Sequence, residues 1–217
     1  MATSVSRSQL QLISITFGKV LLALWLVQLV HGEPDAACKK VPEYLKGESD
    51  EKCCEIPQFF LNETIKDCWS GLERSSKSDA EKSCEFSSCI FKKDNLVKSD
   101  GHMDVDRMRT FIKGVQASSE WKSLAEKVLV EECIPMIEKD AATIRKLMKS
   151  DCDSSPAFLI ACGVAKLFAK CPSSDWTGSP MCDEWKTYFT KCGNTVDDLN
   201  EMFKQVESRK LAESGQQ

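Results

Sequence analysis

Twelve cysteines are the residues of this 217-residue chain best suited to chemistry, and all follow residue 37. An even number of thiols passing through an oxidising compartment predicts six disulfides. Zinc is the competing chemistry, but the closest ligand pair is Cys84-x4-Cys89, and the adjacent Cys53 and Cys54 cannot readily chelate one tetrahedral ion. We therefore predict no metal and no cofactor, and disulfides formed by Cys38, Cys53, Cys54, Cys68, Cys84, Cys89, Cys133, Cys152, Cys162, Cys171, Cys182 and Cys192.

Catalytic patterns are missing from the sequence, which contains no G-x-S-x-G, G-x-G-x-x-G, H-E-x-x-H or calcium-loop motif. His102 is the sole imidazole after residue 32, and its position in a turn predicts an exposed loop residue rather than a general base. The carboxylate pairs Asp197-Asp198 and Glu131-Glu132 are adjacent and diverge on a helix, which indicates solvated faces. We expect no catalytic residues and no enzyme activity.

The first 32 residues are typical of a secretory signal peptide. They lack acidic residues, carry Arg7 and Lys19, and lead into an apolar run at 20–30 that is too short for a comfortable bilayer anchor. Small residues at Val30 and Gly32 predict cleavage after Gly32, which leaves 27 basic against 33 acidic residues and a net charge of −6. We expect a soluble, secreted, extracellular protein that does not bind nucleic acid or acidic membranes.

The periodicity beyond residue 68 is helical almost throughout, so we predict an all-α, compact, disulfide-bridged bundle of about seven or eight short helices. After a turn at Asp100-Gly101, Asp104 is placed to cap a helix. The segment 156–171 is apolar around nearly its whole circumference, which predicts a central helix whose Lys166 and Lys170 share one narrow solvent stripe.

Prolines, cysteines and composition divide the chain into regions. Residues before Cys68 mix three prolines with charges, and Asn62-Glu63-Thr64 within them matches the acceptor triplet for N-glycosylation of Asn62. We expect a signal peptide at 1–32, a loop-rich N-terminal extension at 33–68, a helical core at 69–172, a disulfide-linked C-terminal extension at 173–207 and a flexible tail at 208–217.

Six disulfides exceed what folding alone demands of a mature chain of 185 residues, since each contributes about 2–4 kcal/mol. An empty cavity destabilises a core by about 24 cal/mol per Å3, and ligand pockets begin near about 300 Å3. The product is about 7 kcal/mol, which two or three disulfides would offset. We therefore expect an apolar ligand cavity inside the bundle; resistance to extracellular proteases is the alternative reason for the bridges.

The cysteine spacing resembles that of the Plus-C group of insect odorant-binding proteins. The pattern is Cys152-x9-Cys162-x8-Cys171-Pro172, with ten residues between Cys171 and Cys182 and eighteen between Cys133 and Cys152. The resemblance extends from about residue 53 to 192, with one departure: Cys84 and Cys89 enclose four residues where that family usually has three. It implies that Cys84 pairs with Cys162, Cys89 with Cys54 or Cys68, and Cys171 with Cys133 or Cys152; the spacing itself leaves the connectivity open.

The same resemblance implies a carrier that takes small hydrophobic, odorant- or pheromone-like molecules through aqueous lymph to a membrane odorant receptor, as a monomer or homodimer. The apolar faces of the middle and central helices supply candidate pocket residues, for which ordinary core packing is the competing role. The candidates are Met108, Phe111, Ile112, Leu124, Val128, Ile137, Met148, Phe158, Leu159, Leu167 and Phe168.

A secreted protein-binding module, either an inhibitor or an effector, is the alternative function. In that case the disulfides would stiffen an external surface that carries exposed aromatic anchors. Trp69, Trp121, Trp176 and Trp185 are the candidates, and plugging the edge of a core is the competing role for each.

Overall fold

A computed structural model describes residues 34–42, 52–147 and 152–214. Within those ranges the fold is all-α with no strand, as the sequence predicts, and counting α5, a π-helix and α6 as one unbroken run gives eight helices besides two 3-10 turns. The predicted signal peptide and Met148 lie outside the described residues. The elements are η1 (Ala36–Lys39), α2 (Asn62–Ser70), α3 (Asp79–Lys93), α4 (Val105–Gly114), α5 (Ser119–Ala125), the π-helix η3 (Glu126–Cys133), α6 (Ile134–Lys139), α7 (Ala141–Leu147), α8 (Ser155–Ala169), η4 (Ser173–Asp175), α9 (Pro180–Cys192) and α10 (Val196–Ser214).

The helix starts follow local sequence signals. Asp104 caps α4, as predicted, by accepting a hydrogen bond from the backbone N–H of Arg107 at 3.0 Å. Ser78 and Glu81 form a reciprocal capping box at the start of α3. These side chains fix where α3 and α4 begin.

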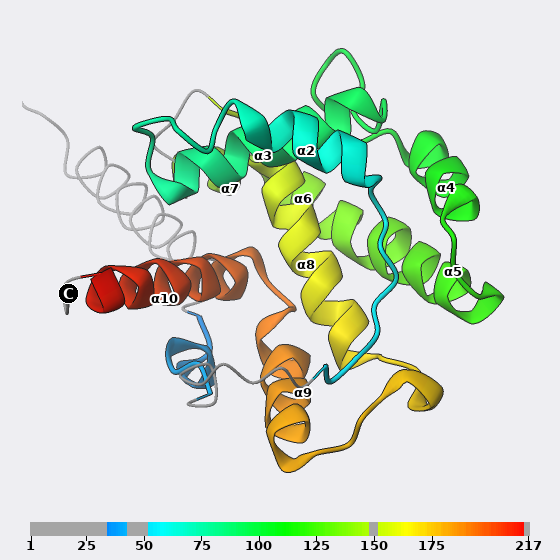
Figure 1. Ribbon diagram of the computed structural model, residues 1–217, viewed down its shortest axis with the longest axis vertical. Helices are drawn as coiled ribbons and strands as arrows, with labels where there is room; N and C mark the ends of the chain where they lie inside the picture. The colour runs from blue at the N-terminus through cyan, green and yellow to red at the C-terminus, as the bar shows by residue number, and fades with distance from the viewer. Residues whose placement is uncertain (1–33, 43–51, 148–151, 215–217) are drawn as a thin grey trace, which may run out of the picture. The chain divides into compact units, whose positions relative to one another are not determined.

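Helix α8 is the central element, drawn in yellow in Figure 1. It contacts α3, α5, α6, α9, α10 and the π-helix, which agrees with its nearly all-apolar circumference. The predicted lysine stripe is wrong in part, because Lys166 and Lys170 both form ion pairs with Glu132 of the π-helix. Lys166 is only 15% exposed. Val164 instead faces solvent, with 48% exposure.

Glu132 therefore does not lie on a solvated face, contrary to the sequence-based expectation. Burial opposes its ionisation, but the hydrogen bonds from Lys170 and Lys166 outweigh that effect and hold the pKa of Glu132 below its ordinary value. The adjacent Glu131, by contrast, is exposed as expected. The two carboxylates differ because only that of Glu132 contacts the lysines of α8.

All twelve cysteines form disulfides, which confirms that prediction, and Cys89 pairs with Cys68, one of its two expected partners. The pairing of Cys84 with Cys162 is wrong, as is that of Cys171 with Cys133 or Cys152. Cys152 precedes α8 and faces α3, whereas Cys162 in mid-helix faces the π-helix and Cys171 reaches the extended chain before α2. The bonds are Cys38–Cys192, Cys53–Cys182, Cys54–Cys171, Cys68–Cys89, Cys84–Cys152 and Cys133–Cys162.

The N-terminal extension is fastened to the C-terminal one by backbone and side-chain bonds as well as disulfides. The backbones of Cys54 and Trp176 form an isolated antiparallel β-bridge, and Thr177 donates its N–H to the carbonyl of Cys53 at 3.0 Å. Asp198 is buried and accepts the backbone N–H of Asp35 at 2.9 Å, so the expectation of a solvated Asp198 is wrong. A carboxylate removed from water needs such donors to compensate for its lost hydration.

Two elements cross the expected regional boundaries. Helix α2 begins at Asn62, inside the segment expected to be loop-rich, and α10 extends to Ser214, inside the segment expected to be a tail. The division into core and extensions remains a prediction.

The π-helix approaches α8 most closely where α8 has a glycine. A Cβ atom on Gly163 would lie 2.6 Å from Cδ2 of Leu129, closer than side-chain atoms approach one another. We expect Gly163→Ala to lower the free energy of unfolding by about 1 kcal/mol, because the cost of overpacking exceeds the gain in helix propensity. In a Leu129→Ala background the same change should stabilise instead. Denaturant unfolding of all four proteins measures this coupling, and additive effects would contradict it.

Candidate functional site

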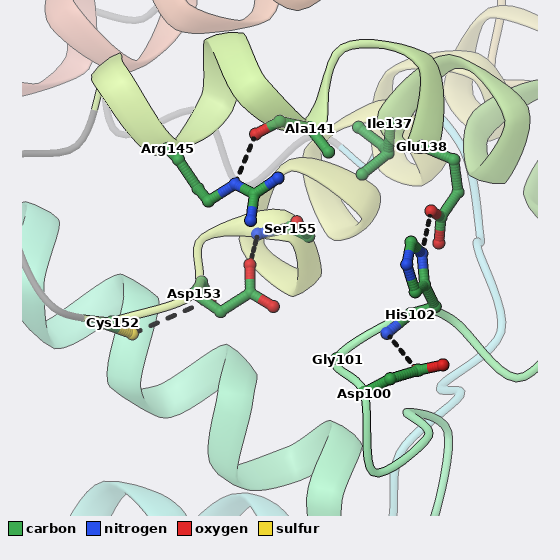
Figure 2. A pocket seen from close by; sticks show the side chains of 10 residues that line it. All are labelled: Asp100, Gly101, His102, Ile137, Glu138, Ala141, Arg145, Cys152, Asp153 and Ser155. Carbon is green, nitrogen blue, oxygen red and sulfur yellow. Dashed lines mark hydrogen bonds and ion pairs between the residues drawn. The ribbon is translucent and has the colours of Figure 1, made fainter.

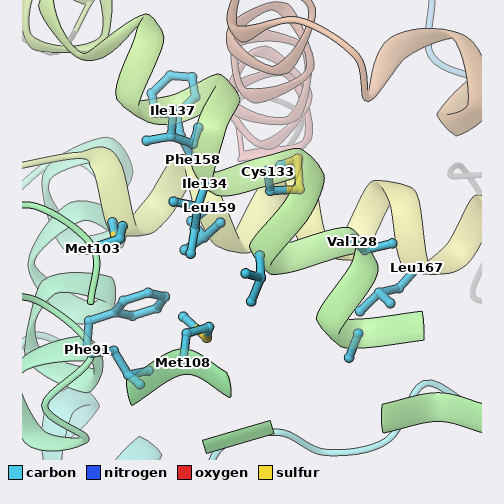
Figure 3. Packing of buried hydrophobic residues seen from close by; sticks show 14 of the residues in the cluster. Phe91, Met103, Met108, Val128, Cys133, Ile134, Ile137, Phe158, Leu159 and Leu167 are labelled. Carbon is cyan, nitrogen blue, oxygen red and sulfur yellow. A yellow bond between two sulfur atoms is a disulfide. The ribbon is translucent and has the colours of Figure 1, made fainter. Parts of the chain in front are cut away.

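Seven of the predicted pocket residues meet in one buried apolar cluster, supplied by four elements of the fold. Figure 3 shows members of this cluster facing one another from separate helices. A fully buried side chain from each of α4, the π-helix, α6 and α8 contributes to it. The seven are Met108, Ile112, Val128, Ile137, Phe158, Leu159 and Leu167.

The remaining described candidates lie at the edge of this cluster or outside it. Phe111 and Leu124 are partly buried and pack against the cluster. Phe168, in the last turn of α8, instead packs edge-on against Trp176 and Phe189, at ring-centroid distances of 5.4 and 5.1 Å. The structure thus brings nine of the eleven predicted residues together, places Phe168 in a separate aromatic group, and does not describe Met148.

Several residues of the cluster were missed by sequence reasoning. The ring of Phe60 lies 5.8 Å from that of Phe91 and 5.3 Å from that of Phe111, so the segment before α2 contributes directly to the core. Leu96 and Met103 come from the loop between α3 and α4 and are also buried. Their signal was weak because a loop residue carries no periodicity that indicates which side it faces.

A pocket of about 360 Å3 opens beside this cluster, at the site shown in Figure 2. Its walls come from the loop before α4, from α6 and α7, and from the start of α8. Ile137 belongs both to this pocket and to the buried cluster, so the pocket reaches the edge of the core. The lining residues are Asp100, Gly101, His102, Ile137, Glu138, Ala141, Arg145, Cys152, Asp153 and Ser155.

Glu138 joins two walls of this pocket. One carboxylate oxygen accepts the backbone N–H of Met103 at 3.0 Å, and the other lies 2.5 Å from Nδ1 of His102. The hydrogen bond with Glu138, helped by the charges of Glu138 and Asp100, raises the pKa of His102 above its ordinary value of 6.5. His102 is an exposed loop residue, as predicted, but it has a specific partner.

Arg145 and Asp153 supply the remaining charges of the pocket. Arg145 donates from Nε to the carbonyl of Ala141 at 3.3 Å, and Asp153 accepts the backbone N–H of Ser155 at 3.0 Å. No ion pair joins Arg145 to any other described side chain. The guanidinium group therefore adds polar donors to a pocket whose lining also includes the apolar side chains of Ile137 and Ala141.

Features of other functional classes are not found among the described residues. No cluster of three or more His, Cys, Asp or Glu side chains within 34–42, 52–147 and 152–214 has the arrangement needed for a metal ion. In those same ranges, every helix falls short of the length and apolar character that crossing a bilayer requires. Trp121 is buried, with its indole N–H bonded to Asp175, and Trp176 packs on Phe168, so neither is an exposed anchor.

Two comparisons with known proteins show what this chain is similar to. A family model described as AgamOBP47-like matches residues 57–188, which include α2 to α8 and most of α9. General odorant-binding protein 68 of Anopheles gambiae is 44% identical over 215 residues, covering 97% of this chain and 99% of the relative.

We expect Glu138→Gln to lower the pKa of His102 toward 6.5, because the carboxylate charge that favours the imidazolium is removed. The stabilisation from a raised pKa is complete below the unfolded value and is lost as pH rises through the folded value. The free energy of unfolding of the wild type should therefore fall, relative to that of the variant, as pH rises from the unfolded to the folded pKa of His102. In a chain lacking residues 1–32, NMR titration follows this single imidazole. An unchanged pKa in Glu138→Gln, or an equal shift in the control Glu131→Gln, would contradict the assignment.

Proposed function

Because this chain belongs to the insect odorant-binding protein family, with twelve cysteines that fit the Plus-C group, we propose that it carries small hydrophobic, odorant- or pheromone-like molecules through aqueous lymph. The single observation that carries this proposal is its similarity to an odorant-binding protein over nearly its whole length. Members of this family bind and carry ligands, so the proposal includes no catalytic step.

The binding region that we propose is the buried apolar cluster. Apolar ligands gain free energy when they leave water for such a surface, and the flexible thioether of Met108 can adapt to guests of varied shape. Support comes from the convergence of α4, the π-helix, α6 and α8 on one region. The proposed contacts in the cluster are Met108, Phe111, Ile112, Leu124, Val128, Ile137, Phe158, Leu159 and Leu167. Phe168, whose ring packs outside the cluster, and Met148, which lies outside the described residues, are proposed as further contacts.

Secretion is the second part of the proposal. The N-terminal pattern of residues 1–32 and the complete pairing of the cysteines both favour an extracellular, oxidising location. A membrane odorant receptor is the proposed recipient of the ligand, and the carrier would reach it as a monomer or a homodimer. A protein-binding module is not favoured, because the chain matches a carrier family. Of its four candidate anchors, Trp121 is buried, and Trp176 and Trp185 pack on other aromatic rings, whereas Trp69 is 41% exposed.

Enlarging a side chain inside the cluster should weaken ligand binding. We expect Leu159→Phe to reduce affinity for the fluorescent apolar dye N-phenyl-1-naphthylamine by about tenfold, because overpacking of this order costs about 1–3 kcal/mol. Val164→Phe makes a similar change on the exposed side of the same helix and should leave affinity unaltered. Titration of the oxidised proteins with the dye measures its dissociation constant in each variant. Displacement of the dye by small volatile esters measures their dissociation constants.

Saturable binding by the wild type is required for this proposal. Absence of dye uptake by the folded, fully oxidised protein would refute the carrier function. Equal losses of affinity in Leu159→Phe and Val164→Phe would place the ligand outside the cluster, and thermal melting of each variant checks that it is folded.

We also propose N-glycosylation at Asn62. Its side chain is exposed in the first turn of α2, where its amide oxygen accepts a hydrogen bond from Gln58 at 2.7 Å. Secretion from insect cells should yield protein whose electrophoretic mobility rises on enzymatic removal of N-glycans. Thr64→Ser preserves the acceptor triplet and should keep this shift, whereas Thr64→Ala should lose it. Identical mobility of treated and untreated wild type would show that the triplet is unoccupied.

A further inference from the structure

The Cys84–Cys152 disulfide has one accessible end and one buried end. Cys84, on α3, is fully buried, whereas Cys152, shortly before α8, is partly exposed and lines the pocket of about 360 Å3 shown in Figure 2. A pocket of this volume has room for a small molecule beside Cys152. Because thiol–disulfide exchange starts on the sulfur that the attacking thiolate can reach, Cys84 is the leaving group at this bond.

Ser154 favours the departure of Cys84. Its side chain is 1% exposed, and its hydroxyl donates a hydrogen bond to Sγ of Cys84 at 3.3 Å. Burial opposes the negative charge that develops on a departing sulfur, and a hydroxyl donor compensates for the lost hydration. Since exchange is faster when the leaving thiolate is stabilised, the position of Ser154 makes this disulfide reactive toward a thiol that reaches Cys152.

The other five disulfides do not combine these features. Three of them have both cysteines buried, namely Cys38–Cys192, Cys53–Cys182 and Cys133–Cys162. In the remaining two, Cys54 and Cys89 are partly exposed, but within the described part of the chain no hydroxyl group donates to the sulfur bonded to either of them. The sulfur bonded to Cys54, Sγ of Cys171, lies 3.6 Å from the carbonyl oxygen of Asp175, which disfavours a negative charge there.

The charges around Cys152 favour an attacking thiol that carries a cation. Three carboxylates line the pocket against one guanidinium and one imidazole, so negative charge prevails whether or not the imidazole is protonated. These groups belong to Asp100, Glu138, Asp153, Arg145 and His102. An ammonium group on the thiol is attracted to such a surface, and a carboxylate on the thiol is repelled by it.

We propose that Cys152 is a modification site that takes up a small aminothiol as a mixed disulfide, a property separate from the carrier function. The thiolate of the aminothiol attacks Sγ of Cys152, a new S–S bond forms, and the Cys84–Cys152 bond breaks. The electron pair of the broken bond stays on Cys84, whose thiolate then takes a proton from water. One disulfide replaces another, so the step consumes no oxidant or reductant. Ser88 donates to the carbonyl of Asp153 at 2.9 Å and keeps this segment beside α3 after the bond opens.

The test is brief exposure of the oxidised chain lacking residues 1–32 to excess cysteamine at about pH 8, where thiolate is available. Acid then stops exchange, N-ethylmaleimide labels free thiols in denaturant, and mass spectrometry of peptides locates both groups. We expect the first modified species to carry cysteamine on Cys152 and the maleimide on Cys84, with the other five disulfides intact. Earlier cleavage of another disulfide, or the two groups on the opposite cysteines, would overturn the proposal.

Two serine variants test the leaving group. Ser154→Ala should slow this first cleavage about fivefold, because Cys84 loses its hydrogen-bond donor. The side chain of Ser154 forms no capping bond to α8, so the start of that helix is retained. Ser87→Ala is the matched control, since Ser87 is also buried but donates to the carbonyl of Ser83, and its rate should equal that of the wild type. Equal slowing in both variants, or none in Ser154→Ala, would contradict the role of Ser154.

A second thiol tests the charge preference. The anion 3-mercaptopropionate should react more slowly than cysteamine once the rate of each thiol is divided by its rate with the neutral disulfide of 2-mercaptoethanol. Asp153→Asn keeps an acceptor for the N–H of Ser155 and should narrow the difference between the two thiols. A normalised rate with 3-mercaptopropionate that equals or exceeds the rate with cysteamine would overturn the choice of an aminothiol.

Discussion

A helix with almost no solvated face must be covered by protein, and this requirement on α8 organises the rest of the molecule. Only Val164 among its large apolar side chains is strongly exposed, so neighbouring helices have to approach α8 from nearly every direction. Three of the six disulfides end on α8 or beside it, at Cys152, Cys162 and Cys171. Packing and covalent bonds thus act on the same element, and the apolar cluster forms where its partners meet.

The π-helix is the most specialised of those partners. Leu129 lies over the one position of α8 that lacks a side chain, Gly163, and Cys133 is bonded to Cys162 one residue earlier. Glu132 is held by two lysines of α8. Extra residues per turn are uncommon in helices and occur often at functional sites. Here they let an apolar contact, an ion pair and a disulfide face the same helix.

The relation between the core and the polar pocket follows from how short the connecting elements are. Helix α6 has six residues, yet it supplies Ile137 to the core and Glu138 to the pocket wall. The loop between α3 and α4 similarly presents Met103 to the core and His102 to the pocket. Consecutive residues of these short segments thus face the core and the pocket.

The sequence alone determined the all-α class, the fact that all twelve cysteines are oxidised, the cap at Asp104 and most members of the apolar cluster. Helical periodicity and an even count of thiols can be read without knowing how the helices pack. Only the tertiary structure decided which cysteine meets which. Thiols spaced alike along a chain face different neighbours once the helices have packed, as Cys162 and Cys152 show. It also decided that Glu132 and Asp198 are partly or fully buried, that Phe168 lies apart from the cluster, and that His102 contacts Glu138. A charge or a loop side chain has no periodic signature, and its environment is set by residues distant in sequence.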